Sequence, residues 1–211
     1  MIPPLMQNVL DKKGIKDLRP AQEKAIAAGL FDGNNLLVCT PTASGKTLVG
    51  ELGMLWHVKR EPVMAIYVVP LRALASEKYK AFTKSYPELQ IAQTSGDMDS
   101  DDAYLHRFDI IITTSEKLDS LLRHRAPWLS KVRCVVIDEI HLLNDHSRGP
   151  TLEILITLLK SRPIQLIGLS ATIGNEEELA QWLNAKLVHD TWRPVKLEKG
   201  IYDDGELTFY E

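Results

Sequence analysis

Five short apolar runs recur along the chain, and longer segments with helical spacing lie between them. The apolar runs cover residues 36–39, 65–69, 110–113, 134–137 and 166–169. Each is apolar at almost every position, which is typical of a strand that is covered on both faces of a sheet. The helical spacing covers residues 46–59, 72–85, 116–123 and 151–160. This alternation predicts an α/β fold, a mostly parallel sheet with helices on both faces.

Two of the predicted helices begin at pairs of residues with capping-box spacing. Thr113 with Glu116 is one pair, and Asn175 with Glu178 is the other. In such a pair the first side chain accepts a hydrogen bond from the backbone of the first turn, and the second reaches back to the cap. We therefore expect Thr113 and Asn175 to be N-caps.

Composition excludes several classes of protein. The chain has 211 residues and a formal net charge of −3, so it does not coat nucleic acid by bulk positive charge. Its two cysteines, Cys39 and Cys134, both lie in apolar runs, which favours buried free thiols over a disulfide framework. The longest apolar run, residues 63–69, is far shorter than a bilayer span, and the N-terminus has no basic signal-peptide region. These features predict a cytoplasmic protein.

A phosphate-binding loop follows the first apolar run. It reads Pro41, Thr42, Ala43, Ser44, Gly45, Lys46 and Thr47, between a predicted strand and a predicted helix. In this setting backbone N–H groups hold the phosphates, the lysine approaches the β- and γ-oxygens, and the hydroxyl after it binds Mg²⁺. The strict pattern has glycine at position 40, where this chain has Thr40. We expect Lys46 to lie in an exposed loop, and an incidental Gly-Lys-Thr at a helix start is the plain alternative.

A carboxylate pair follows the fourth apolar run. Asp138 and Glu139 come directly after residues 134–137, and His141 follows them. The carboxyl ends of parallel strands are where α/β sheets bind ligands. We therefore expect Asp138 to hold Mg²⁺ through its water shell and Glu139 to orient and deprotonate an attacking water. The alternative is a solvated loop that happens to carry two acids.

Read in order, six segments of the chain resemble the sequence motifs of superfamily 2 helicases. These segments are Leu18-Arg19-Pro20-Ala21-Gln22 (Q motif), residues 41–47 (motif I), 69–74 (Ia), 114–117 (Ib), 138–141 (II, in its DExH form) and 170–172 (III). The resemblance implies a RecA-like motor domain that uses ATP and Mg²⁺. It also implies that Gln22 reads the adenine edge through paired hydrogen bonds.

The same resemblance implies roles for three further groups of residues. Phosphates of a nucleic-acid strand would be held at the starts of two helices, by Arg72 and by Thr114, Glu116 and Lys117. The nucleotide state would be relayed to the nucleic acid by His141, Ser170 and Thr172. The plain alternatives are a solvated helix start, a helix cap with a surface charge pair, a core histidine and ordinary caps after a strand.

Other segments resemble one branch more closely, the archaeal DNA repair helicases called Hjm, which are related to the helicase half of polymerase theta. They are residues 96–100, 141–143, 148–153 and 192–195. The resemblance implies a lead-in over residues 1–20, a first RecA-like domain over 21–190, and short strands over 191–211 that lead towards a second motor domain. That second domain, with its arginine finger, and the family's winged-helix and ratchet domains have no counterpart in this sequence.

The function implied by the resemblance is the ATP-binding motor domain of a DNA helicase that acts on single-stranded or forked DNA in repair. Two other functions stay open. The motifs alone do not separate DNA from RNA as the substrate, and a single motor domain is also compatible with a nucleotide-gated binding module that does not turn over.

Overall fold

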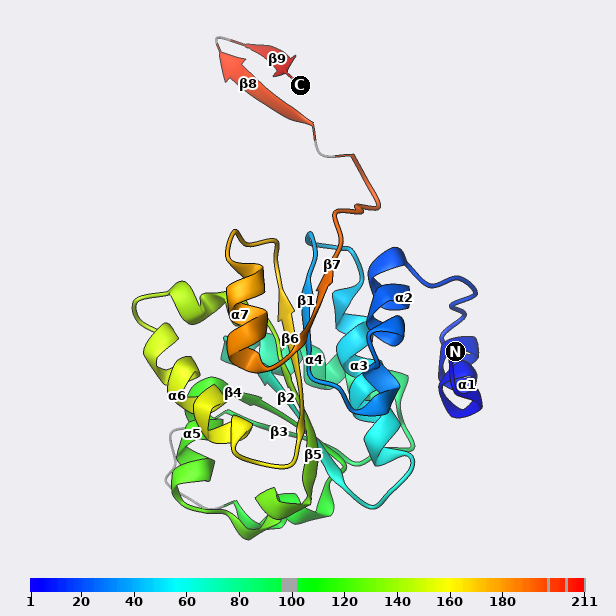
Figure 1. Ribbon diagram of the computed structural model, residues 1–211, viewed down its shortest axis with the longest axis vertical. Helices are drawn as coiled ribbons and strands as arrows, with labels where there is room; N and C mark the ends of the chain where they lie inside the picture. Colours follow the sequence, from blue (N-terminus) through cyan, green and yellow to red (C-terminus); the bar gives the residue numbers. More distant parts are fainter. Residues whose placement is uncertain (96–101, 197, 204, 211) are drawn as a thin grey trace.

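The computed structural model describes residues 1–95, 102–196, 198–203 and 205–210. Its centre is a sheet of parallel strands (Figure 1). They are β1 (Leu36–Cys39), β2 (Met64–Val69), β3 (Ile91–Thr94), β4 (Ile110–Thr114), β5 (Val132–Ile137), β6 (Gln165–Ser170) and β7 (Lys186–His189). Their order is β3-β4-β2-β5-β6-β1-β7, so β6 separates β1 from β5. This sheet confirms the α/β, RecA-like class expected from the sequence.

Helices cover both faces of the sheet. One face carries α1 (Pro4–Lys12), α2 (Pro20–Ala27), α3 (Lys46–Val58) and α4 (Arg72–Ser85). The other face carries α5 (Ser115–Arg123), α6 (Gly149–Lys160) and α7 (Glu176–Leu183). Successive residues of β1 point to opposite faces, since Leu36 and Val38 belong to the first core and Leu37 and Cys39 to the second. The five apolar runs of the sequence are buried on both sides, as predicted, whereas the edge strand β7 exposes Lys186 and His189.

Helix α3 lies unusually close to the sheet. A Cβ atom added at Gly53 would lie 2.2 Å from Cδ1 of Ile167 on β6. Glycine permits this close approach, because a Cβ atom there would force the Ile167 side chain to move. The helix that begins at the phosphate loop is thus set firmly against the strand next to β1.

The structure corrects two expected caps and adds one strand. Thr113 is fully buried within β4, and Thr114 is the N-cap of α5, with its Oγ1 accepting from the N–H of Lys117 at 3.4 Å. Asn175 lies at the N-cap position of α7, but its side chain makes no capping hydrogen bond. Strand β3 was not expected, because this short edge strand ends in Gln93 and Thr94 and so lacks an uninterrupted apolar run.

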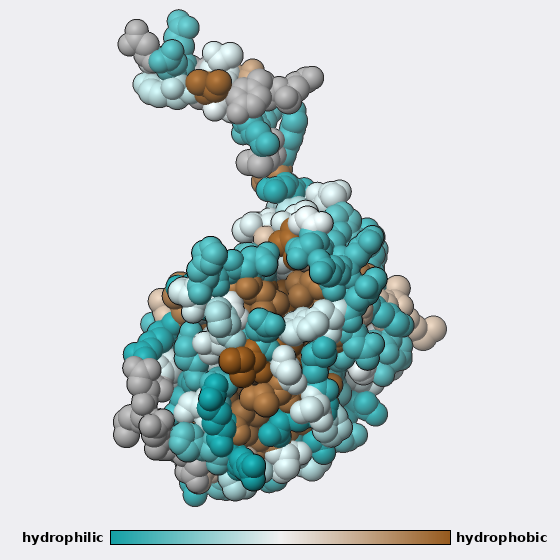
Figure 2. Space-filling model, turned by 60° about the vertical axis from the view of Figure 1, so that its left-hand side comes forward, coloured by the Kyte–Doolittle hydropathy of each residue, from teal (hydrophilic) through white to brown (hydrophobic). Residues whose placement is uncertain are grey.

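Two features lie outside the packed core: an exposed apolar pair on helix α6 and a hairpin near the C-terminus. Helix α6 exposes Ile154 and Leu158, one turn apart, on a side of the molecule where Figure 2 shows apolar surface. The antiparallel strands β8 (Lys199–Asp203) and β9 (Glu206–Tyr210) form a hairpin that extends away from the sheet in Figure 1. Residues 96–100, which contribute to the family resemblance, lie outside the described residues.

The two cysteines are buried free thiols, as expected. Burial, together with the nearby carboxylate of Glu176, raises the pKa of the Cys39 thiol to about 12. Both cysteines therefore keep their protons at neutral pH and act as small apolar side chains. In the described ranges, no helix has the length and apolar character needed to cross a membrane.

Candidate nucleotide-binding site and adjoining groove

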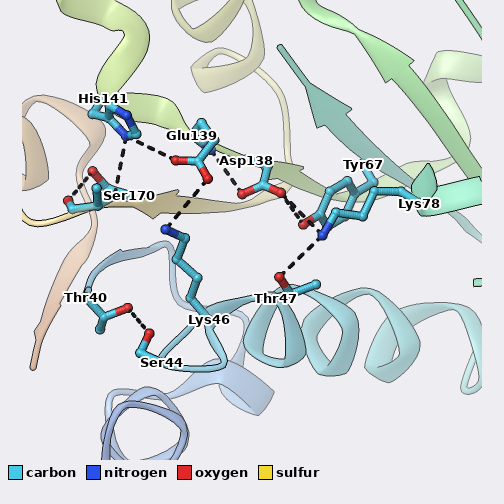
Figure 3. Close-up of polar contacts among 11 residues, drawn as sticks. Thr40, Ser44, Lys46, Thr47, Tyr67, Lys78, Asp138, Glu139, His141 and Ser170 are labelled. Carbon is cyan, nitrogen blue, oxygen red and sulfur yellow. Dashed lines mark hydrogen bonds and ion pairs between the residues drawn. The ribbon is translucent and has the colours of Figure 1, made fainter. Parts of the chain in front are cut away.

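The phosphate loop connects the end of β1 to the start of α3. Ala43 and Gly45 both adopt left-handed backbone conformations, with φ angles of 64° and 91°. At Gly45 a Cβ atom would also lie 2.5 Å from Nε2 of Gln22, so glycine is required there on two grounds. The hydroxyls of Thr40 and Ser44 lie 2.6 Å apart and tie the two ends of the loop together (Figure 3). Thr40, which stands where the strict pattern has glycine, thus supplies a hydroxyl that hydrogen-bonds to Ser44.

Lys46 is the first residue of α3, and only 11% of its side chain is exposed. The expectation that it lies in an exposed loop is therefore wrong. Its Nζ lies 3.7 Å from Oε1 of Glu139, across the gap between the loop and the end of β5 (Figure 3). A helix N-terminus adds partial positive charge at the same place. The cation and the loop backbone together form a site suited to the phosphates of a nucleotide.

Asp138 is held in place through both of its carboxylate oxygens. The Tyr67 hydroxyl donates to Oδ2 at 2.8 Å, and the backbone N–H of Glu139 donates to Oδ1 at 3.1 Å. Burial, and then the carboxylate of Asp138, raise the pKa of Tyr67 well above its usual value, so the phenol keeps its proton and remains a donor. Tyr67 carried no motif signal in the sequence, although it is a lone aromatic residue in an otherwise aliphatic strand.

The Lys78 ammonium group lies between the two residues predicted to bind the metal. Its Nζ is 3.4 Å from Oγ1 of Thr47, to which it donates, and 3.7 Å from Oδ2 of Asp138 (Figure 3). A hydroxyl and a carboxylate are hard oxygen donors that suit Mg²⁺, and a cation from the protein already lies beside both. Thr47 and Asp138 therefore fit the ion that the sequence predicted.

Lys78 was missed, although the sequence holds a signal for it. It lies three residues after Ala75 and four before Phe82, and these two residues are buried on α4. A lysine at that spacing points towards the sheet, and so requires a partner there.

His141 connects the carboxylate pair to the segment after β6. Its Nδ1 lies 3.4 Å from Oε2 of Glu139 and 3.4 Å from the backbone nitrogen of Ala171. A neutral ring can accept from Ala171 at Nδ1, whereas a protonated ring donates to Glu139. Of the three residues predicted to relay the nucleotide state, His141 and Ser170 thus lie at one junction, where the Ser170 hydroxyl donates to the carbonyl of Ala171 at 2.7 Å. Thr172 is exposed two residues beyond β6.

Gln22 lies against the phosphate loop and is almost fully buried. Its Oε1 accepts from the backbone N–H of Arg19 at 2.9 Å, and its Nε2 donates to the carbonyl of Gly45 at 3.0 Å. An amide has a second lone pair and a second N–H, so one acceptor and one donor position remain for a base. A cavity of about 590 Å³ lies beside it, lined by Lys13, Asp17, Arg19, Gly45, Thr47 and Glu51 among others.

The starts of α4 and α5 line a second cavity, of about 480 Å³, which we call the Ia/Ib groove. Its lining includes Pro70, Leu71, Arg72, Thr114, Glu116, Lys117 and Arg148. The segments predicted to hold nucleic acid therefore do lie together. Arg148, which the sequence suggested only as part of the closer family resemblance, is added to them from the start of α6.

Lys117 differs from the expectation of a phosphate-binding side chain. Only 4% of it is exposed, and its Nζ pairs with Oδ2 of Asp102 at 3.0 Å. Its backbone N–H is used by the Thr114 cap. The ammonium group is therefore turned inward, and the groove presents the exposed side chains of Arg72 and Glu116 instead.

Comparisons with known proteins identify the family of the chain. A family model described as DEAD/DEAH box helicase matches residues 19–180, which is most of the chain. The chain belongs to the DEAD/DEAH box helicase family. The match contains the phosphate loop, the carboxylate pair and the segment after β6, so the family assignment and the site rest on the same residues.

Curated relatives include two proteins named ATP-dependent DNA helicase Hel308. The one from Methanococcus vannielii is 50% identical over 210 residues, covering 96% of this chain and 28% of the relative. The one from Methanocaldococcus jannaschii is 53% identical over 209 residues, covering 95% of this chain and 17% of the relative. The chain thus spans less than a third of the length of either relative.

A solved structure titled as the DUF1998 helicase MrfA bound to DNA is also similar. It superposes with a TM-score of 0.76 and 27% identity, covering 90% of this chain and 30% of that one. A second structure of the same helicase, with DNA and AMPPNP, superposes equally well.

Proposed function

We propose that this chain is the N-terminal ATP-binding motor domain of an ATP-dependent DNA helicase that acts in repair or at stalled or branched forks. The observation that carries the proposal is the meeting of Lys46 and Thr47 with Asp138 and Glu139 at the carboxyl ends of β1 and β5. The Ia/Ib groove opens beyond the ends of β2 and β4, at the same edge of the sheet. The relatives named as DNA helicases support DNA as the polymer.

In this proposal each residue of the site has one task. The loop backbone and Lys46 hold the phosphates, and Gln22 holds the adenine edge. Thr47 and Asp138 hold Mg²⁺, which neutralises the charge that develops on the transferred group. Glu139 accepts the proton of the water that attacks the γ-phosphorus as the bond to the β–γ bridging oxygen breaks. His141 faces Glu139 at 3.4 Å, and is placed to relay the change to Ser170 and Thr172.

The proposal includes further parts outside this chain and a cytoplasmic location. We divide the chain as the sequence suggests, with residues 1–20 as a lead-in, 21–190 as the motor domain, and 191–211 leading to a second RecA-like domain. Winged-helix and ratchet domains complete the protein in this proposal. The greater length of the relatives supports further domains, and the apolar surface on α6 offers them a place to pack.

Steady-state hydrolysis by residues 1–211 tests the proposal. We expect the chain to bind Mg-ATP but to turn it over slowly, with little stimulation by single-stranded DNA, because the family's arginine finger belongs to the second motor domain. Such arginines contribute about 10³–10⁵ to the rate. The control is Glu139→Gln, which should keep Mg-ATP binding and lose the residual hydrolysis.

Three results would contradict the proposal. Absence of Mg-ATP binding by the folded chain would exclude the motor domain altogether. Tighter binding of an RNA oligomer than of a DNA oligomer of matched sequence would favour an RNA helicase. Robust DNA-stimulated hydrolysis by this chain alone would mean that an arginine of a second copy completes the site.

A further inference from the structure

The Lys78 side chain reaches the nucleotide site from α4. This helix carries none of the motif residues that the sequence assigned to that site. It lies in the second turn of α4, whose first residue is Arg72. Its side chain is 17% exposed, with Nζ 5.5 Å from the centroid of the Tyr67 ring. Asp138, its carboxylate partner, is 10% exposed. A carboxylate so little hydrated is stabilised by a cation beside it.

The position of this ammonium group conflicts with that of a metal ion. Mg²⁺ binds its directly coordinated oxygens at about 2.0–2.1 Å, and it holds further groups through the waters among those oxygens. An ion that shares Thr47 and Asp138 would therefore occupy the space beside the same two oxygens that Lys78 Nζ now approaches at 3.4 and 3.7 Å. Two cations at such a distance repel strongly in a site with little water.

We propose that Lys78 is a built-in counter-ion of the magnesium site, and that its ammonium group competes with the divalent cation for Thr47 and Asp138. The inference rests on the proposed function only in that the competing ion is Mg²⁺. Before the metal binds, Lys78 balances Asp138 and keeps its carboxylate oriented together with Tyr67. When the metal binds, the ammonium group moves away from the two oxygens. Lys78 is thus a positioning residue that sets the affinity for the metal.

The test measures binding of Mn²⁺, as a paramagnetic probe for Mg²⁺, in the absence of nucleotide. The variant is Lys78→Met, which removes the charge and keeps an apolar stem beside Tyr67. We expect it to bind Mn²⁺ about tenfold more tightly than the unmodified chain, because no ammonium group has to be displaced from Thr47 and Asp138. Lys78→Arg, which keeps the charge, should stay within about twofold of the unmodified chain on the same reasoning.

Matched variants assign the effect to this site. Lys80→Met removes an exposed lysine two residues further along α4 and should change nothing. Asp138→Asn in the Lys78→Met background should abolish the gain. An unchanged or weaker Mn²⁺ affinity in folded Lys78→Met would overturn the proposal, as would a gain that survives Asp138→Asn.

A measurement on the unmodified chain decides the matter if Lys78→Met does not fold. Acetylation of lysines is followed by mass spectrometry, with and without millimolar Mg²⁺. We expect Lys78 to react faster with Mg²⁺ present and Lys80 to react at the same rate. An unchanged rate at Lys78 would overturn the inference. Fluorescent-ATP binding, measured in parallel, separates this failure from a failure of the proposed function, since only the latter would remove ATP binding.

Discussion

Lys46 and Lys117 lie in the first turns of two helices that each follow a parallel strand, and the sequence assigned phosphate binding to both. Lys46 faces Glu139 across an open gap at 3.7 Å, and the carboxylate of Glu139 is 35% exposed. Lys117 is buried, and it pairs with Asp102 at 3.0 Å where both side chains are almost fully covered. We infer from this difference that a lysine near a helix start is available to a ligand only where its carboxylate partner is open to solvent.

The replacement Lys46→Ala should cause the largest change. Removing a cation from a mostly buried contact with phosphate costs about 3–5 kcal/mol, or roughly a hundredfold to several thousandfold in affinity. The fold should persist, because Glu139 keeps contact with water. A fluorescent-ATP titration beside a thermal melt measures both effects. Unchanged affinity in the folded variant would show that Lys46 does not bind the nucleotide and that the assignment of the phosphate loop is wrong.

Lys117→Met should act on stability and leave ligand binding unchanged. The substitution leaves Asp102 buried without its cation, and breaking such a pair costs about 3 kcal/mol in the free energy of unfolding. Urea denaturation measures this loss, with Lys80→Met as the exposed control. The affinity of the folded variant for single-stranded DNA should stay within about twofold. A stable variant with much weaker DNA binding would make Lys117 a phosphate ligand after all.

The smallest effect should come from a substitution in the Ia/Ib groove, measured through the salt dependence of DNA binding. With a net charge of −3 the chain has no bulk attraction for DNA, so binding depends on a few phosphate contacts. We expect a slope of about −1 to −3 when the logarithm of the binding constant is plotted against that of salt concentration. Arg148→Ala should reduce the magnitude of that slope by about 0.7, the contribution of one phosphate on a single strand. Arg125→Ala, beyond the opposite end of α5, is the control and should leave the slope unchanged.

The sheet could be predicted from the sequence because its strands are buried on both faces and therefore read as uninterrupted apolar runs. The phosphate loop and the carboxylate pair could be placed at one edge because parallel strands all end there. Their pairing through Lys46 and Glu139 was not predictable in detail, since it depends on β6 lying between β1 and β5.

The roles of Tyr67 and Lys78 depend on side chains that meet from elements far apart in the chain. The spacing of apolar residues could have indicated that Lys78 points towards the sheet. It could have indicated the same of Lys117. Positions 117, 118, 121 and 122 form the buried face of α5, so a lysine at the first of them points inward. The position of Lys117 within a motif predicted phosphate binding, whereas the helical face on which it lies turns its side chain inward.

Helix α4 begins at Arg72 in the groove and carries Lys78 beside the metal ligands, six residues later. At about 1.5 Å per residue, the backbone positions of these two residues lie roughly 9 Å apart along the helix axis. A helix segment of that length bends little. A movement of Lys78 that tilts α4 therefore also moves Arg72. The proposed nucleotide site and the groove proposed to hold DNA are thus connected by less than two turns of one helix.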